Sequence, residues 1–348
     1  MLLRKYILSV ILASAGFIIA LILMELYFEF AEIVSPSVVD VDAHIGSVFR
    51  PNKNLVLFKE GFYVGGTNKY GYLGPAYPPF KKENTVRIAL IGDSYVEGFQ
   101  LFDRHHFRTI MEKELKKDLQ KDVEVLNFGR SGFSFPDMYC YFKNFVMTFS
   151  PDIVIFFVHQ TDLNTHEQMF GPRCYINNGK LDISYAFNQA EAFKFRGKTD
   201  FLRGKLSLLS LISNCGKLFS EGLTWEILLD KFYVNYLKKD ENKGESRGNN
   251  PAMSSIDSAI VRELNEINHA GSQTNIMVVN MGMNKDAINI FTDLGLAVID
   301  PSPALEELKN EGINPHAWKA TRTTGHWNHE ANKAVGVFLA GEVKKIVN

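Results

Sequence analysis

The chain has 348 residues, of which 46% are hydrophobic and 22% are charged, and its formal net charge is -1. This is ordinary globular composition, and the near-zero charge provides no basic field of the kind that binds nucleic acid. Three widely spaced cysteines show no metal-ligand spacing, which argues against a zinc ribbon. They leave open a single disulfide in an oxidising compartment, with its pair unspecified.

The N-terminus carries the first strong pattern. Residues 6–24 are uncharged, follow an Arg-Lys pair and precede two glutamates. A helix of about 20 apolar residues spans a bilayer core, and flanking basic residues favour the cytoplasmic side. We therefore expect residues 1–30 to be a transmembrane anchor with the rest of the chain extracytoplasmic. A cleaved signal peptide, ending near the Ala-Ser-Ala triplet at 13–15, is the alternative, and it also exports the domain.

Residues 31–85 form an irregular juxtamembrane leader, rich in proline, glycine and tyrosine, that we expect to wrap onto the following domain. From residue 86 to 348 the pattern changes to strands that alternate with amphipathic helices. Short runs that are nearly all apolar predict strands at 87–91, 123–128, 152–158, 275–280 and 296–300. Strands of this kind are typical of a parallel sheet buried on both faces, so the sequence predicts a doubly wound α/β domain.

One interval, residues 171–251, contains no convincing parallel strand. Two segments of helical period, 201–219 and 224–239, precede a polar, Gly/Asn-rich stretch. We interpret the interval as a largely helical insertion, and a lid over the site is one role for it.

A Gly-Asp-Ser triplet follows the first predicted strand of the domain. Ligands bind at the carboxyl ends of strands in α/β sheets, and Gly92 permits a tight turn there. The N–H groups that begin the next helix would point at the same place. Ser94 is therefore a candidate nucleophile, although the triplet alone also fits a helix-capping serine.

Three further blocks accompany this triplet in a characteristic order. The triplet lies in the first block, "IGDSYVEG". The three that follow it are "VLNFGRSGFS", "PDIVIFFVHQTDLN" and "TTGHWNHEANKAVG". Together the four blocks resemble those of the SGNH (GDSL-type) hydrolase superfamily, over about 87–348 without the insertion. The resemblance implies a three-layer α/β/α fold with a five-stranded parallel sheet. The upstream "NKYGYLGPAYP" is similar to the leader of membrane-tethered members.

The resemblance also implies roles for individual residues. Ser94 stands at the nucleophile position and His326 at the position of the catalytic base. The backbone N–H groups of Ser94 and Gly132 would bind the oxyanion, and Asp93 would hydrogen-bond within the turn. A serine hydroxyl needs such a base near neutral pH, and imidazole can take the proton and return it.

Two departures from the family pattern bear on activity. In the third block the family's glycine falls on His159 and its asparagine on Thr161, whose shorter hydroxyl is the third candidate oxyanion donor. Gln160 would substitute if the loop shifts by one residue, and Asp162 follows. In the fourth block the positions of the family's acid hold Thr323 and Thr324, which leaves a Ser94–His326 dyad oriented by a hydroxyl or a carbonyl.

Other polar residues receive less weight. Trp327 either packs the base in place or is a core aromatic residue. We expect His105 and His106 to lie on the surface, and Asp300 to cap the helix after it. The spacing of His326 and His329 does not support a metal site, and neither a metal nor an organic cofactor is required.

These observations favour an exported, membrane-anchored serine esterase or O-acyltransferase. The Gly-His-Trp-Asn ending is similar to that of members acting on O-acetyl groups of extracellular polysaccharide, which implies an acylated carbohydrate as substrate. One alternative is a catalytically degenerate glycan-binding or assembly subunit, suggested by the missing acid and asparagine. Another is a lysophospholipase, with the leucines of 206–218 as a lipid-facing lid.

Overall fold

The computed structural model describes residues 2–31, 38–57, 60–163, 170–203, 205–209, 211–212, 253–269 and 274–347. The chain forms two compact units, one of Met1–Asp40 and Phe195–Gly248, the other of Val41–Lys194 and Asn249–Asn348. The first half of the chain contains α1 (Leu2–Ala31), β1 (Val39–Asp42), β2 (Gly46–Phe49), β3 (Asn54–Leu57), β4 (Tyr63–Gly66), β5 (Thr85–Gly92), α2 (Ser94–Glu97), η1 (Asp103–His105), α3 (Phe107–Asp118), β6 (Asp122–Gly129), α4 (Phe135–Asn144), η2 (Val146–Phe149), β7 (Ile153–Val158) and η3 (Gln160–Asp162). The second half contains β8 (Arg173–Asn177), β9 (Lys180–Ser184), η4 (Ala186–Gln189), α5 (Glu191–Arg203), α8 (Ser255–His269), β10 (Asn275–Asn280), α9 (Lys285–Asp293), β11 (Ala297–Ile299), α10 (Ser302–Asn310), β12 (Ala317–Trp318), β13 (Thr323–Thr324) and α11 (His329–Val347).

Helix α1 belongs to the first unit. Its segment Arg4–Phe28 has a mean hydropathy of 2.8 and is long and apolar enough to cross a membrane, judged by length and composition. A signal sequence near the N-terminus meets the same criteria, so the helix fits both of the interpretations given above. Within the same unit the Glu25 carboxylate accepts hydrogen bonds from the backbone N–H groups of Ser207 (2.5 Å) and Leu208 (2.9 Å).

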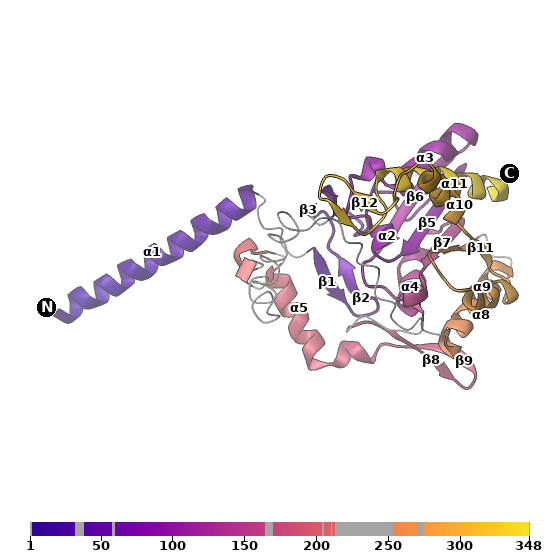
Figure 1. Ribbon diagram of the computed structural model, residues 1–348. Coiled ribbons are helices and arrows are strands. Elements are labelled where there is room, and N and C mark those ends of the chain that lie inside the picture. The colour runs from indigo at the N-terminus through magenta and orange to yellow at the C-terminus, as the bar shows by residue number, and fades with distance from the viewer. Residues whose placement is uncertain are drawn as a thin grey trace. The chain divides into compact units, whose positions relative to one another are not determined.

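The second unit is built on a five-stranded parallel sheet with the order β11-β10-β7-β5-β6 (Figure 1). All five strands were predicted from their apolar runs, to within two residues at each end, and the predicted α/β class is confirmed. Every residue of β5 and of β7 is buried, because helices cover both faces of the sheet.

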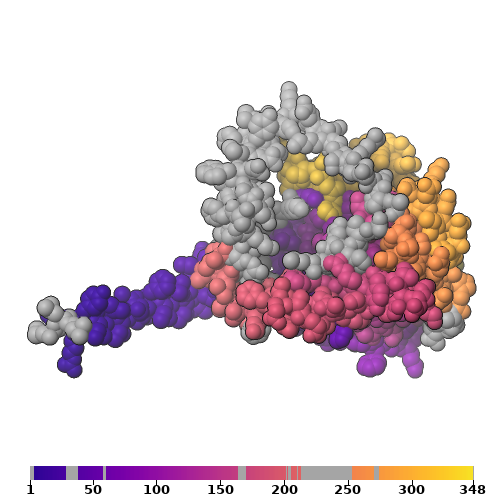
Figure 2. Space-filling view, turned by 90° about the horizontal axis from the view of Figure 1, so that it is seen from below, coloured from indigo at the N-terminus to yellow at the C-terminus, as the bar shows by residue number. Residues whose placement is uncertain are grey.

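Alternate residues of the strands supply two separate cores. Ala89, Ile91 and Phe156 pack on one side with α4 and α8, whereas Ile88, Leu90 and Ile155 pack on the other with α3 and α11. The sheet is thus the middle of three layers. In the space-filling view, the orange region of α8 and α9 borders the yellow C-terminal region of the same unit (Figure 2).

The leader is more ordered than its composition indicates. Strands β3 and β4 form an antiparallel hairpin, and Tyr63 at the start of β4 packs against Phe99 with ring centroids 5.0 Å apart. Phe49 at the end of β2 also contacts Phe99. The Arg130 guanidinium lies 3.8 Å from the centroid of the Phe49 ring. Aromatic contacts of this kind hold the leader against the loops that follow β5 and β6.

The insertion also departs in part from expectation. It begins with an antiparallel hairpin, β8–β9, whose turn residues Asn178 and Gly179 both have positive φ, as a tight two-residue turn requires. Helix α5 follows. The helical segment predicted at 224–239 lies outside the described residues, and so do residues 204, 210 and 213–219 of the one at 201–219, including Cys215.

Candidate active site

Ser94 opens helix α2 immediately beyond the buried strand β5. Gly92 ends that strand, and a Cβ there would lie 2.4 Å from Cγ2 of Val96, so only glycine permits the turn. Asp93 is the N-cap, and its carboxylate accepts a hydrogen bond from the N–H of Tyr95 at 2.9 Å. The turn places the Ser94 hydroxyl at the carboxyl edge of the sheet, at the first position of α2.

His326 reaches Ser94 from the segment between β13 and α11. Its Nε2 lies 2.7 Å from Oγ of Ser94, across 232 positions of sequence. The Nε1–H of Trp318 donates to the carbonyl of His326 at 3.0 Å, and the ring of Tyr95 packs against the imidazole with centroids 4.7 Å apart. The hydrogen bond to the backbone carbonyl of His326 and the contact with the Tyr95 ring together fix the orientation of the imidazole.

A carboxylate completes this arrangement, and it comes from the leader. Oε1 and Oε2 of Glu60 each lie 2.9 Å from Nδ1 of His326, and Oε2 also accepts the backbone N–H of His326 at 2.8 Å. Glu60 lies between β3 and β4, 266 positions before the histidine. Residues Ser94, His326 and Glu60 thus form a continuous hydrogen-bonded chain of hydroxyl, imidazole and carboxylate, the geometry of a catalytic triad.

Thr323 and Thr324, considered as substitutes for the missing acid, do not contact the imidazole. Thr323 lies 2.8 Å from the hydroxyl of Thr321, which in turn donates to the backbone carbonyl of Glu60. Thr324 is exposed on β13. The fourth block predicts a Ser94–His326 dyad without an acid. The structure adds the Glu60 carboxylate, which comes from a distant part of the chain.

The polar chain is largely shielded from water. The side chains of His326 and Glu60 are 21% and 10% exposed. Burial also raises the pKa of the Asp93 carboxyl, and this is partly offset by its hydrogen bond from Tyr95 and by the positive potential of His326 and His159. A site with little water screens its charges weakly, which strengthens the contact between imidazole and carboxylate.

The second block lies against the nucleophile turn. The N–H of Arg130 donates to the carbonyl of Gly92 at 2.9 Å. The Glu97 carboxylate, at the end of α2, accepts the backbone N–H of Ser131 at 3.2 Å and also its hydroxyl. These contacts hold the loop that contains Gly132, which has a positive φ of 74°, beside α2.

The third block follows β7, the strand next to β5. The side chain of Gln160 is buried and accepts the N–H of Asn284 at 2.7 Å, so it fixes the loop after β10. The carboxylate of Asp162 accepts the N–H of His159 at 2.8 Å. The hydroxyl of Thr161 lies 2.7 Å from Nδ1 of His159.

The remaining histidines and Trp327 have separate places. Trp327 is 4% exposed and packs in the core against Tyr95 with ring centroids 5.2 Å apart, so it is a core residue that also supports the base. The surface position expected of His106 is wrong. Its side chain is buried, stacks on Phe107, and accepts the N–H of Arg108 as the cap of α3.

Outside the site, Asp300 accepts the N–H of Ser302 at 2.9 Å at the start of α10, as expected. His329 is exposed at the first position of α11. Among the described residues, no group of three or more His, Cys, Asp or Glu side chains is placed to hold a metal ion.

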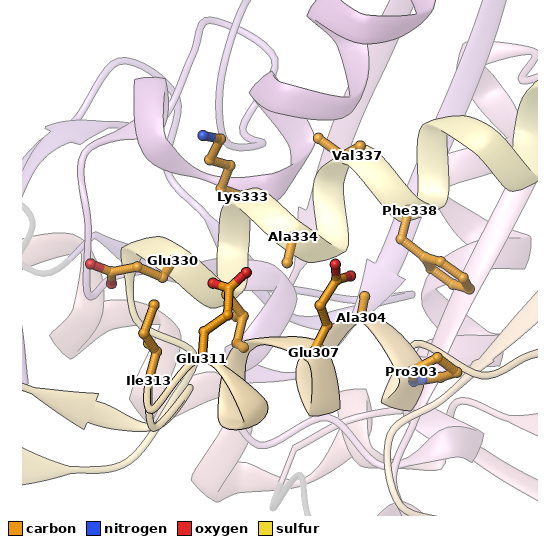
Figure 3. A pocket seen from close by; sticks show the side chains of 11 residues that line it. Pro303, Ala304, Glu307, Glu311, Ile313, Glu330, Lys333, Ala334, Val337 and Phe338 are labelled. Carbon is orange, nitrogen blue, oxygen red and sulfur yellow. The ribbon is translucent and has the colours of Figure 1, made fainter.

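A surface groove of about 650 Å³ between α10 and α11 contains none of the triad residues. Figure 3 shows Glu307 of α10, and Glu311 directly after that helix, extending into this groove opposite α11. Its position in the fold separates it from the site around Ser94.

In sequence order the sheet runs 2-1-3-4-5, the flavodoxin-like arrangement, and the first three blocks follow its first three strands. The histidine of the fourth block returns to the same edge just before the last helix. This sheet order and these positions of the blocks are the ones that the resemblance to the SGNH hydrolases implies.

No protein-family model and no curated protein matches the chain. Similar solved structures include a lipase/acylhydrolase from Enterococcus faecalis, with 13% identity and a TM-score of 0.39 over 75% of this chain and 96% of that one. They also include a protein assigned to the lipolytic G-D-S-L family of Desulfitobacterium hafniense (12%, TM-score 0.33, 74% and 98%) and the acetyl xylan esterase AlAXEase (14%, TM-score 0.34, 76% and 100%). Similarity this distant assigns no activity, so the activity has to be argued from the site itself.

Glu60 is the functional residue that the sequence motifs did not reveal. No family block contains it, and in the sequence its neighbourhood shows only short apolar runs on either side of a Lys-Glu-Gly triplet. The one available signal was indirect. A catalytic histidine without an acid at the two usual positions implies that a carboxylate from elsewhere completes the site.

Proposed function

We propose that this protein is a serine esterase of the SGNH type. The observation that carries the proposal is the continuous contact from Oγ of Ser94 through the imidazole of His326 to the carboxylate of Glu60. A hydroxyl is a weak nucleophile at neutral pH, and this arrangement supplies both a base and the charge that stabilises the base once it is protonated.

In the first half of the reaction, Oγ of Ser94 attacks the ester carbonyl carbon while its proton passes to Nε2 of His326. The carbonyl oxygen becomes an oxyanion and accepts hydrogen bonds from the backbone N–H groups of Ser94 and Gly132. The bond to the leaving alcohol then breaks, and Nε2 returns the proton to that oxygen. Glu60 keeps Nδ1 protonated, so that Nε2 is free to accept.

In the second half, the acyl group leaves Ser94 by the same chemistry. A water molecule gives one proton to Nε2 of His326 and its oxygen attacks the acyl carbon. The bond from that carbon to Oγ of Ser94 then breaks, Nε2 returns the proton to Oγ, and the free acid leaves. A sugar hydroxyl in place of water gives an O-acyltransferase by the same steps. The site geometry supports acyl-enzyme chemistry, and the acceptor is a separate question for experiment.

The finer assignment, to O-acetyl groups of an extracellular carbohydrate, is supported by the resemblance of the "TTGHWN" segment and by the apolar N-terminal helix. In this proposal the helix anchors the protein and the SGNH domain acts on the extracytoplasmic side. The lysophospholipase alternative depends on the leucines of 206–218. Leu206, Leu208, Leu209 and Leu211 are described and belong to the first unit, whereas Leu218 lies outside the described residues.

The alternative of a degenerate binding subunit is based on the missing acid and the missing asparagine, and the Glu60 carboxylate removes the first of these two grounds. The experiment is hydrolysis of p-nitrophenyl acetate by the full chain in detergent, compared with Ser94→Ala and with Ser302→Ala, an exposed serine at another helix start. We expect the first variant to be inactive and the second to match the wild type, with fluorophosphonate labelling lost only in the first. Equal, inert behaviour of wild type and Ser94→Ala, with polysaccharide still retained, would establish the binding subunit instead.

A further inference from the structure

His159 lies next to the nucleophile turn because β7 and β5 are neighbours in the sheet. Ile91 of β5 pairs with Phe156 of β7, and the two strands end at Gly92 and Val158. His159 is thus the first residue beyond β7, beside Asp93 at the same edge, with strands about 4.8 Å apart. An electrostatic interaction between His159 and the Asp93 carboxyl agrees with this position.

The ring of His159 is fixed by its own loop. The backbone N–H of His159 donates to the carboxylate of Asp162, as in a capping box, and the backbone N–H of Thr161 donates to Nδ1 of His159 at 3.2 Å. Gly282 packs against the edge of the ring formed by Nε2 and Cδ2, and a Cβ at Gly282 would come within 3.3 Å of both atoms. The side chain is therefore preorganised rather than free to rotate.

These contacts determine which ring nitrogen carries the proton. Since the backbone N–H of Thr161 donates to Nδ1, that nitrogen is an acceptor, and the neutral imidazole carries its proton on Nε2. The hydroxyl oxygen of Thr161 is only 2.7 Å from the same bare Nδ1, so the hydroxyl proton must lie between the two atoms. The hydroxyl of Thr161 consequently has no proton left to offer an oxyanion.

The Nε2–H of His159, by contrast, donates no hydrogen bond to any described residue. Within the part of the chain that the structure describes, no group hydrogen-bonds to Nε2, and the side chain is only half-buried. A fixed N–H donor at the carboxyl edge of the sheet, beside the Ser94 turn, is the kind of group that stabilises a developing oxyanion.

We propose that the Nε2–H of His159 is the third oxyanion donor, in the place that the family gives to an asparagine amide and that the motif pattern assigned to Thr161. The inference rests on the proposed esterase function. During attack by Ser94, the carbonyl oxygen accepts hydrogen bonds from the N–H groups of Ser94 and Gly132 and from Nε2–H of His159. No bond to His159 forms or breaks, and the imidazole remains neutral throughout.

The kinetic test compares His159→Ala, Thr161→Val and His159→Gln with the wild type on p-nitrophenyl acetate. Loss of an oxyanion donor lowers kcat by about 100-fold to 1000-fold, so we expect His159→Ala to lose kcat in that range with KM nearly unchanged. Thr161→Val keeps the backbone contact to Nδ1, and we expect it to lose less than about tenfold. Glutamine carries an N–H donor at a similar reach and should restore part of the loss.

A second measurement does not depend on turnover. In the ¹⁵N-histidine-labelled full chain in detergent, the His159 signal, assigned by its loss in His159→Gln, should show the tautomer protonated at Nε2. A signal protonated at Nδ1 would overturn the inference, because Nδ1 would then donate to Thr161 and leave the threonine hydroxyl free.

The two proposals fail in different ways. If Ser94→Ala is inactive while His159→Ala retains wild-type kcat, or loses less than Thr161→Val, the esterase stands and the role of His159 is wrong. If the wild type and Ser94→Ala are equally inert, the esterase itself fails, and the role of His159 in catalysis fails with it.

Discussion

Replacing Glu60 with glutamine tests the triad most directly. The glutamate accepts two hydrogen bonds from His326, one from Nδ1–H at 2.9 Å and one from the backbone N–H at 2.8 Å. A glutamine of nearly the same shape has only one oxygen, so either the backbone or the ring meets an NH₂ group. If the NH₂ faces the ring, Nδ1 becomes the acceptor and Nε2 carries the proton, and the histidine can no longer take a proton from Ser94.

The expected loss is large because the pair is shielded. With side chains only 10% and 21% exposed, solvent compensates little for a lost charge. Exchange of a triad acid for its amide lowers kcat by about 10⁴-fold, equivalent to about 5.4 kcal/mol of transition-state stabilisation. We expect a loss of this order for Glu60→Gln, and a smaller loss for Glu60→Asp, which keeps the charge at a shorter reach.

The assay is steady-state hydrolysis of p-nitrophenyl acetate, with thermal unfolding measured in parallel to show that each variant is folded. Glu311→Gln, at the exposed end of α10, is the matched control and should retain wild-type kcat. Activity of Glu60→Gln within about threefold of the wild type, in a folded protein, would refute the assignment of Glu60 as the triad acid, since the loss expected is about 10⁴-fold.

Three further predictions test other parts of the structure. In Gly325→Ala the new Cβ would lie 2.4 Å from the carboxyl carbon of Glu60, so kcat should fall by at least about tenfold while the carboxylate charge remains; unchanged kcat would contradict the placement of Glu60. Burial lowers the pKa of His106 to about 4 from 6.5, so the unfolded chain binds a proton that the native state does not bind between these values. Its contribution to stability is complete above pH 6.5 and falls by about 3 kcal/mol as the pH drops to 4, and the difference in unfolding free energy between wild type and His106→Asn should follow that window. The buried sulfurs of Cys140 and Cys174 lie 3.3 Å apart, so protein exported to an oxidising compartment should join them, and alkylation of both cysteines after denaturation without reductant would contradict that pairing.

The sheet and two members of the triad were predictable from the sequence because both depend on local patterns. Apolar runs such as 152–158 indicate buried strands wherever they occur, and the four blocks fix where Ser94 and His326 stand relative to those strands. The Asn-Gly turn at 178–179 was also a readable hairpin signal, although the polar residues of β8 and β9 obscured the strands on either side.

Glu60 and His106 were not predictable because their roles depend on tertiary contacts. The acid meets its histidine across 266 positions, and nothing in the surrounding residues distinguishes it from a glutamate on the surface. His106 follows another histidine and precedes a helix, which is a surface pattern. The ring is nevertheless enclosed by Phe107 and by Gly98, where a Cβ would come within 2.2 Å of the imidazole.

The position of Glu60 in the leader has a practical consequence for which part of the chain the proposed esterase needs. A shortened chain starting at residue 86 would keep every strand of the sheet, the serine and the histidine, and would still lack the carboxylate. Hydrolytic competence therefore requires that the β3–β4 hairpin be docked. If the proposed esterase function is correct, the polypeptide between the N-terminal helix and the sheet contributes a residue of the active site and is more than a spacer.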